Sequence, residues 1–202
     1  MSAIEFRELN GHLIPFENGM ALAAFRAEDE AQQWVRNQGL MAPKVIILGL
    51  GSGVHVRQWI EANPECQVTV IDPRPALLQT FLAANEDLQE QIEILVIDSQ
   101  VGLLQHEIMG RVAQEVPPVL LFKPAVGLWS DFFETAFATL TGRNIEGLKF
   151  FLKNYGFGSD VTSESMANRR LLTIRDLGMV VDANHEGHPA ASAVRVLREL
   201  VL

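Results

Sequence analysis

Three glycines and a distant aspartate are the residues whose types and spacing best suit ligand chemistry. Gly49, Gly51 and Gly53 stand in "ILGLGSGVHV", between an apolar run and an amphipathic segment. Glycines at such a turn let the backbone approach a ligand closely, and the first residues of a helix offer free N–H groups. Asp72 follows the next apolar run, where a carboxylate accepts hydrogen bonds from ribose hydroxyls. The pattern predicts a site for a small-molecule nucleoside ligand.

A third feature lies at the corresponding position, the end of the next predicted strand. Asp98, with Ser99 after it, closes the third apolar run, so all three features lie at carboxyl ends of neighbouring predicted strands, where open α/β sheets bind ligands. The residues predicted to contact the ligand are Gly49, Leu50, Gly51, Ser52, Gly53, His55, Asp72, Pro73, Asp98 and Ser99. A structural alternative stays open, because glycines at a strand–helix turn can serve packing alone and an aspartate after a strand can cap a helix.

An alternation of strands and helices must position these residues. The apolar pattern predicts strands at residues 44–49, 67–72, 92–98 and 117–123, and helices at 54–63, 75–85 and 102–114. Short connections between alternating strands and helices indicate right-handed crossovers and a parallel sheet. We therefore expect an α/β fold with a three-layer Rossmann-like sheet and helices on both faces.

The flanking segments predict additions to this core. Residues 3–17 contain Asn10-Gly11, a dipeptide favoured in tight turns, and predict a small hairpin. A helix is expected at 27–39, and the pattern becomes mainly helical from 126 onward, with a last helix at 191–202. We expect one Rossmann-like domain over 1–202, with a core at about 40–125 and a helical extension at 126–202.

Composition limits the kinds of partner that the protein is expected to bind. The 202 residues carry a formal net charge of −9, without the basic excess that nucleic-acid binding requires. The single cysteine, Cys66, cannot form an intrachain disulfide, which fits a reducing compartment. No signal peptide is expected, and no apolar run approaches the roughly 18–20 residues of a membrane span. We expect a cytoplasmic protein that binds neither nucleic acid nor membrane.

The glycine loop resembles a known turn. Val54 stands where the dinucleotide motif Gly-x-Gly-x-x-Gly needs its third glycine, and the loop instead resembles the Gly-x-Gly-x-Gly turn of Rossmann-like S-adenosylmethionine-dependent methyltransferases. The resemblance implies S-adenosylmethionine as cofactor, with adenine near Asp98 and Ser99, and a small-molecule methyltransferase as activity. Ile47 replaces an acidic residue of that family's loop. The sequence "FKPA" at 122–125 replaces the Asn/Asp-Pro-Pro-aromatic motif of amino-directed members, so catalysis stays open.

A longer stretch resembles a second family. "ENGMALAAFRAEDEAQQWV", "GLGSGVHV" and "LFKPAVGLWSDFFETAFATL" resemble the N-terminal Rossmann-like domain of bacterial motility accessory factors, and Asp72-Pro73 and His55 match its pattern. Those glycosyltransferase-like proteins are linked to flagellin glycosylation, and their catalytic domain has its own glycine-rich loop, which this sequence lacks. The resemblance implies a non-catalytic accessory or interaction module, including a homodimer as one form of it.

Other candidate motifs favour ordinary structural roles. "HEGH" at 185–188 has the wrong spacing for a zinc-protease helix, and Ser52 lacks the Gly-x-Ser-x-Gly setting of a nucleophile. A nucleotide-sugar enzyme is the least supported hypothesis, because no Asp-x-Asp motif is present. Phe132, Phe133 and Phe137 fall at helical spacing and predict core or a subunit interface.

Overall fold

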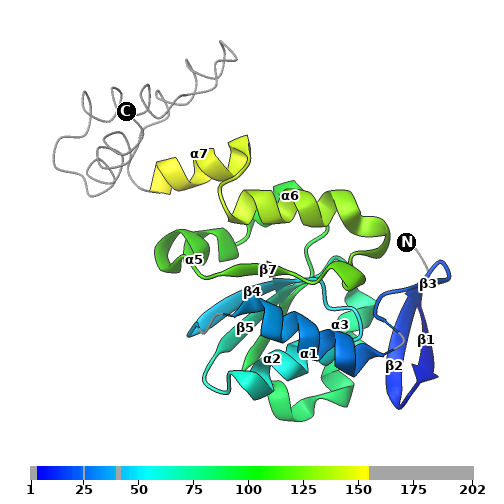
Figure 1. Cartoon of the computed structure of the whole chain (residues 1–202). Helices are drawn as coiled ribbons and strands as arrows, with labels where there is room; N and C mark the ends of the chain where they lie inside the picture. The colour runs from blue at the N-terminus through cyan, green and yellow to red at the C-terminus, as the bar shows by residue number, and fades with distance from the viewer. Residues whose placement is uncertain (1–3, 25, 40–41, 155–202) are drawn as a thin grey trace, which may run out of the picture. The chain divides into compact units, whose positions relative to one another are not determined.

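A four-stranded parallel sheet forms the centre of the first of two compact units of the chain (Figure 1). The computed structural model describes residues 4–24, 26–39 and 42–154. The strands of this sheet are β4 (Lys44–Leu48), β5 (Gln67–Ile71), β6 (Ile92–Leu95) and β7 (Val119–Leu121). Their order is β6-β5-β4-β7, and every neighbouring pair is parallel. Each strand lies within its predicted range, so the prediction of a parallel sheet is confirmed.

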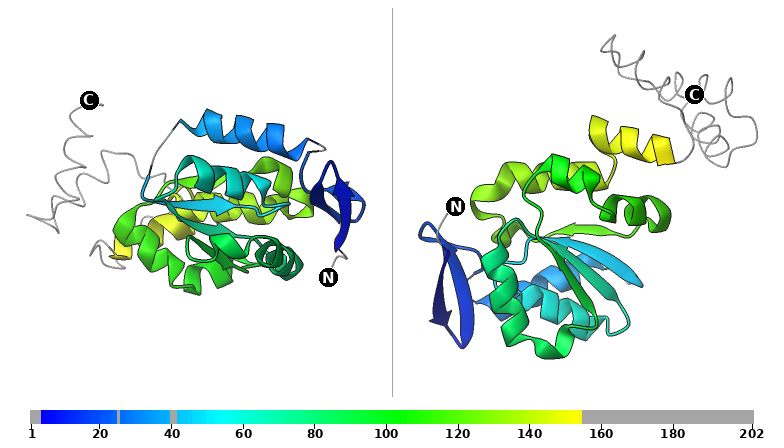
Figure 2. Two further views of the ribbon diagram at one scale, coloured as in Figure 1. Left: turned by 90° about the horizontal axis from the view of Figure 1, so that it is seen from below. Right: turned by 180° about the vertical axis from the view of Figure 1, so that it is seen from behind.

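Helices cover both faces of the sheet. The helices of this part are α1 (Ala27–Gln38), α2 (Val54–Ala62), α3 (Pro75–Ala84), α4 (Gln100–Gln105), α5 (Ile108–Glu115) and α6 (Ser130–Leu140). Short 3₁₀ turns are η1 (Glu86–Leu88), η2 (Lys123–Ala125) and η3 (Gly127–Trp129). Figure 1 shows α1 and α2 on one side of the sheet and α5 and α6 on the other, and Figure 2 shows these layers in two further views. The expected three-layer Rossmann-like architecture is confirmed.

The strand sequences are apolar on both faces because both faces are covered. Val45 and Ile47 of β4 belong to a core cluster with Trp59 of α2 and Phe81 of α3. Side chains alternate across a strand, so Ile46 points to the opposite face, and it is 2% exposed. Double burial explains why β4 is a continuous run of branched aliphatic residues.

One predicted helix is wrong in its extent. The segment predicted as a single helix at 102–114 forms two helices, α4 and α5, which are interrupted at His106. The backbone of His106 is extended (φ −77°, ψ 144°), and its ring Nδ1 accepts a hydrogen bond from the Ile108 N–H at 3.2 Å. His106 therefore ends the α-helical hydrogen bonding of α4 and supports the start of α5.

A small antiparallel sheet precedes α1. It consists of β1 (Ile4–Leu9), β2 (His12–Glu17) and β3 (Met20–Ala21), in that order. Asn10 (φ 53°) and Gly11 (φ 80°) are both left-handed, as a two-residue turn between β1 and β2 requires. The hairpin prediction is confirmed, and β3 extends it by a third strand. Ile14 and Phe16 of β2 are buried against Ala27 and Val54.

The chain divides into two compact units, Met1–Asn144 and Ile145–Leu202. In the second unit the structure describes α7 (Ile145–Asn154). With α6, it confirms the predicted helical character after residue 126, as far as residue 154. The predicted last helix at 191–202 and the "HEGH" segment at 185–188 lie outside the described residues. Among the residues described, no helix has both the length and the apolar content to cross a membrane.

Candidate functional site

The glycine loop connects the carboxyl end of β4 to the first turn of α2. Gly49 (φ 95°), Gly51 (φ 49°) and Gly53 (φ 77°) all adopt the left-handed conformation that favours glycine. The Gly53 N–H donates to the Leu50 carbonyl at 2.7 Å, and the Gly53 carbonyl accepts from the N–H of Arg57 in α2 at 3.1 Å. The predicted strand–turn–helix geometry is therefore present.

The chain itself fills the space beside this loop. A Cβ atom at Gly51 would lie 2.5 Å from the carbonyl oxygen of Leu22, in the segment that follows the hairpin, and 3.0 Å from Cβ of Ala125. A Cβ atom at Gly53 would overlap the ring of Phe81. Each of these glycines is thus required by packing within the protein, whether or not a ligand also uses the loop.

Asp72 directly follows β5 and lies under the loop, as predicted, but its carboxylate is already fully engaged. Oδ2 accepts from the Leu50 N–H at 2.8 Å and from Nη2 of Arg74 at 2.7 Å. Oδ1 accepts from the backbone N–H and from Nε of Arg74, at 3.0 and 2.7 Å. Asp72 is 1% exposed. A ribose could reach this carboxylate only if Arg74 moved away.

Arg74 also joins Asp72 to the hairpin. Its Nη1 lies 3.4 Å from Oε2 of Glu17, the last residue of β2, and its Nη2 donates to the Ala125 carbonyl at 2.6 Å. The other Glu17 oxygen accepts from the indole N–H of Trp129 at 3.1 Å. The side chains of Arg74 and Glu17 are 3% and 0% exposed. We call Glu17, Asp72 and Arg74 the buried charge cluster; such groups are stable in a protein interior only while paired and hydrogen-bonded.

His55 is a core residue. Its Nε2 lies 3.0 Å from the Gly49 carbonyl, and because a carbonyl only accepts, this nitrogen carries the proton. The ring stacks on Phe122 with a centroid distance of 3.6 Å and meets Trp34 edge-on at 5.4 Å. Desolvation lowers the pKa of His55 to about 3, although the Gly49 hydrogen bond opposes the shift. The neutral His55 ring thus holds the Gly49 carbonyl of the glycine loop through this hydrogen bond.

The remaining predicted residues lie in different environments. Pro73 is buried between Asp72 and Arg74, whereas Asp98 and Ser99 are exposed at the carboxyl end of β6. The Ser99 hydroxyl caps α4 by accepting from the Gly102 N–H at 3.2 Å. Ser52 is half-buried and borders a cavity of about 380 Å³ that Phe6, Leu13 and other residues enclose on the outer side of the loop. A small molecule could approach Ser52 there without reaching Asp72.

Sequence reasoning did not identify Glu17 and Arg74 as partners of Asp72. Arg74 is two residues from Asp72, so the "DPR" sequence contains a local signal for a salt bridge. Glu17 is 57 positions from Arg74, and no periodicity links them. The predicted ribose-binding carboxylate and its protein partners thus form one closed network.

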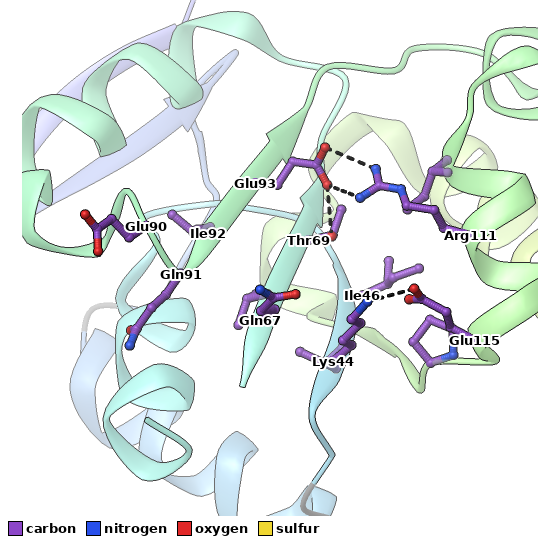
Figure 3. A pocket seen from close by; sticks show the side chains of 14 residues that line it. Lys44, Ile46, Gln67, Thr69, Glu90, Gln91, Ile92, Glu93, Arg111 and Glu115 are labelled. Atoms are coloured by element: carbon purple, nitrogen blue, oxygen red, sulfur yellow. Dashed lines mark hydrogen bonds and ion pairs between the residues drawn. The ribbon is translucent and has the colours of Figure 1, made fainter. Parts of the chain in front are cut away.

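A second polar cavity, of about 240 Å³, lies at the amino ends of the strands (Figure 3). Arg111 of α5 binds both oxygens of Glu93 at 2.8 and 3.1 Å, and Glu93 also accepts from the Thr69 hydroxyl at 3.2 Å. The Arg111 hydrogen bond lowers the pKa of Glu93. Lys44 pairs with Glu115 at 2.7 Å. The two cations drawn in Figure 3 are each ion-paired within the chain, so this cavity offers little attraction to an anion.

No group of three or more potential metal ligands is found among the residues that the structure describes. The chain matches no protein-family model and no curated protein.

Proposed function

We propose that this chain is a non-catalytic Rossmann-like module that acts through contacts with protein, with its glycine loop and Asp72 used for internal structure. The observation that carries the proposal is the saturated carboxylate of Asp72, which binds Leu50 and Arg74 instead of facing a crevice. Ligand sites in open α/β sheets need accessible groups at this edge.

Opening the site would disturb the folded core. A ligand that reached the Asp72 carboxylate would have to displace Arg74, which is 3% exposed and also contacts Glu17. Breaking such a buried ion pair costs about 3–5 kcal/mol. This penalty would be subtracted from the free energy of ligand binding, which favours a structural role.

The sequence resemblance to the N-terminal domain of motility accessory factors agrees with a non-catalytic module. A relationship to that family rests on this resemblance alone. The glycosyltransferase chemistry of that family is not proposed for this chain. S-adenosylmethionine binding is the second candidate, because Asp98 and Ser99 remain exposed after the carboxyl end of β6. In this candidate, Arg74 leaves Asp72 when the nucleoside enters, and methyl transfer would follow only with an acceptor site.

Isothermal titration calorimetry with S-adenosylhomocysteine tests the proposal, with a panel of nucleotide sugars alongside. We expect no binding heat from the wild-type protein. Micromolar binding that Asp72→Ala abolishes and Asp98→Ser leaves measurable would contradict the proposal and establish a working nucleoside site. Unfolding curves of both variants serve as the control, because we expect Asp72→Ala to lower stability and Asp98→Ser to leave it nearly unchanged.

A further inference from the structure

β6 forms one edge of the four-stranded sheet. Within the described ranges, β6 ends the strand order and no strand pairs with its outer side. All four residues of β6 are half-buried, and the following Val96 is 43% exposed. The sequence from Ile92 to Val96, "IEILV", contains neither proline nor lysine, two residues that protect an edge from pairing, and its one charged residue, Glu93, is ion-paired with Arg111.

The register with β5 determines which backbone groups face outward. The Val68 N–H donates to the Gln91 carbonyl at 2.9 Å, and the Asp72 N–H donates to the Leu95 carbonyl at 3.1 Å. Backbone groups alternate along a strand, so Gln91, Glu93 and Leu95 bond to β5. The N–H and C=O groups of the intervening residues, Ile92, Ile94 and Val96, therefore point away from the sheet.

We propose that β6 pairs with β6 of a second copy of this chain, antiparallel, about a two-fold axis at Ile94. Ile94 then faces the partner's Ile94, and Ile92 faces the partner's Val96. These are the residues whose backbone groups point outward, so each such pair exchanges two hydrogen bonds. A two-fold axis brings a surface onto itself, and an edge centred on Ile94 supplies its own complement. The pairing would join two four-stranded sheets into one.

Charge and exposed apolar surface favour this register. An axis at Glu93 would place two like carboxylates directly opposite each other, whereas the axis at Ile94 places Glu93 opposite the partner's Leu95. Glu93 is already paired with Arg111 inside its own chain (Figure 3). Val101, in the helix that follows β6, is a further exposed apolar residue, at 63%. The inference concerns the sheet edge and does not depend on the role of the glycine loop.

Sedimentation velocity of the full chain from about 1 µM to about 100 µM tests the proposal. We expect a concentration-dependent dimer that Val96→Lys weakens at least about ten-fold. Leu128→Lys is the matched control, because Leu128 is another exposed apolar residue (56%) and follows β7 at the opposite edge. A chain that stays monomeric, or a dimer that both lysine variants weaken equally, would overturn the proposal.

A cysteine variant tests the register separately. In a hydrogen-bonded antiparallel pair the Cα atoms lie about 5.5 Å apart, within the range of a disulfide. Ile94→Cys should therefore form a covalent dimer on mild oxidation, whereas Leu128→Cys should not. A dimer in solution that Ile94→Cys fails to cross-link would refute the axis at Ile94. Loss of the dimer would leave the calorimetric result on the glycine loop unaffected, so the two proposals fail independently.

Discussion

Replacing Arg74 with methionine should be among the most damaging single changes in this protein. Methionine retains much of the side-chain volume but removes the guanidinium, which donates to Asp72 at 2.7 Å through both Nε and Nη2 and contacts Glu17 at 3.4 Å. Both carboxylates would stay buried, at 1% and 0% exposure. Breaking a buried ion pair by removing one partner costs about 3–5 kcal/mol, and here two carboxylates lose the same partner. We therefore expect a loss of at least about 3 kcal/mol, a large part of the 5–15 kcal/mol that stabilises a typical domain.

Urea unfolding followed by circular dichroism measures this loss. Arg57→Met is the matched control, because Arg57 pairs with Asp87 at 2.8 Å while 36% of its side chain is exposed. A surface pair of this kind contributes about 0–1 kcal/mol. If Arg74→Met proved no more destabilising than Arg57→Met, the reasoning that the cluster requires its guanidinium would be refuted.

A double variant gives a second check of the same reasoning. Adding Glu17→Gln to Arg74→Met removes one of the two carboxylates, and the double variant should lose less stability than the two single losses combined.

Three further variants test neighbouring contacts. The pKa of His55 is about 3 in the folded state against 6.5 as the ordinary value. The unfolded chain therefore takes up the proton first as the pH falls, which costs the wild type about 2 kcal/mol between about pH 7 and about pH 5. His55→Phe should lack this loss of stability when unfolding curves recorded at the two pH values are compared. Gly51→Ala should lower the unfolding midpoint more than Gly11→Ala, because a Cβ at Gly11 meets nothing within 4 Å and only the left-handed φ, worth about 1 kcal/mol, opposes it. Trp129→Phe should cost about 1–3 kcal/mol in the same assay, because Glu17 loses the indole N–H; an unchanged midpoint would show that this hydrogen bond contributes nothing.

The predictable part of this fold came from local patterns. The strand at 44–49 is a continuous branched aliphatic run that ends in glycine, and the hairpin turn has the Asn10-Gly11 pair whose left-handed geometry both residues tolerate. The spacing of apolar residues and the residue types of a turn act over a few positions, so both can be recognised in a single sequence. The break at His106 was missed because no proline marks it; the glycines at 102 and 110 lie inside the two helices.

The position of the candidate site was predictable, and its surroundings were not. Leu50 of the glycine loop and Asp72 meet at the carboxyl edge of the sheet, as the parallel topology predicts. The contacts of Leu22 with the glycine loop and of Glu17 with Arg74 depend on where the N-terminal hairpin packs. No local sequence pattern encodes that packing. His55, which was predicted to contact the ligand, is buried and is enclosed by Phe122 and Trp34. Ligand binding by the predicted residues stays a prediction.

The hydrogen bond between Glu17 and Trp129 joins distant parts of the chain and therefore sets an order of events during synthesis. Glu17 and Trp129 are 112 positions apart, although their side chains share a hydrogen bond in the finished protein. At about 5–20 residues per second, a ribosome needs about 6–20 s to make the chain between them. The hairpin, which local turns can form first, must wait during that time before Glu17 can meet Trp129. We therefore expect the hydrogen bonds that Ala125 and Trp129 contribute around Arg74 and Glu17 to form late in synthesis.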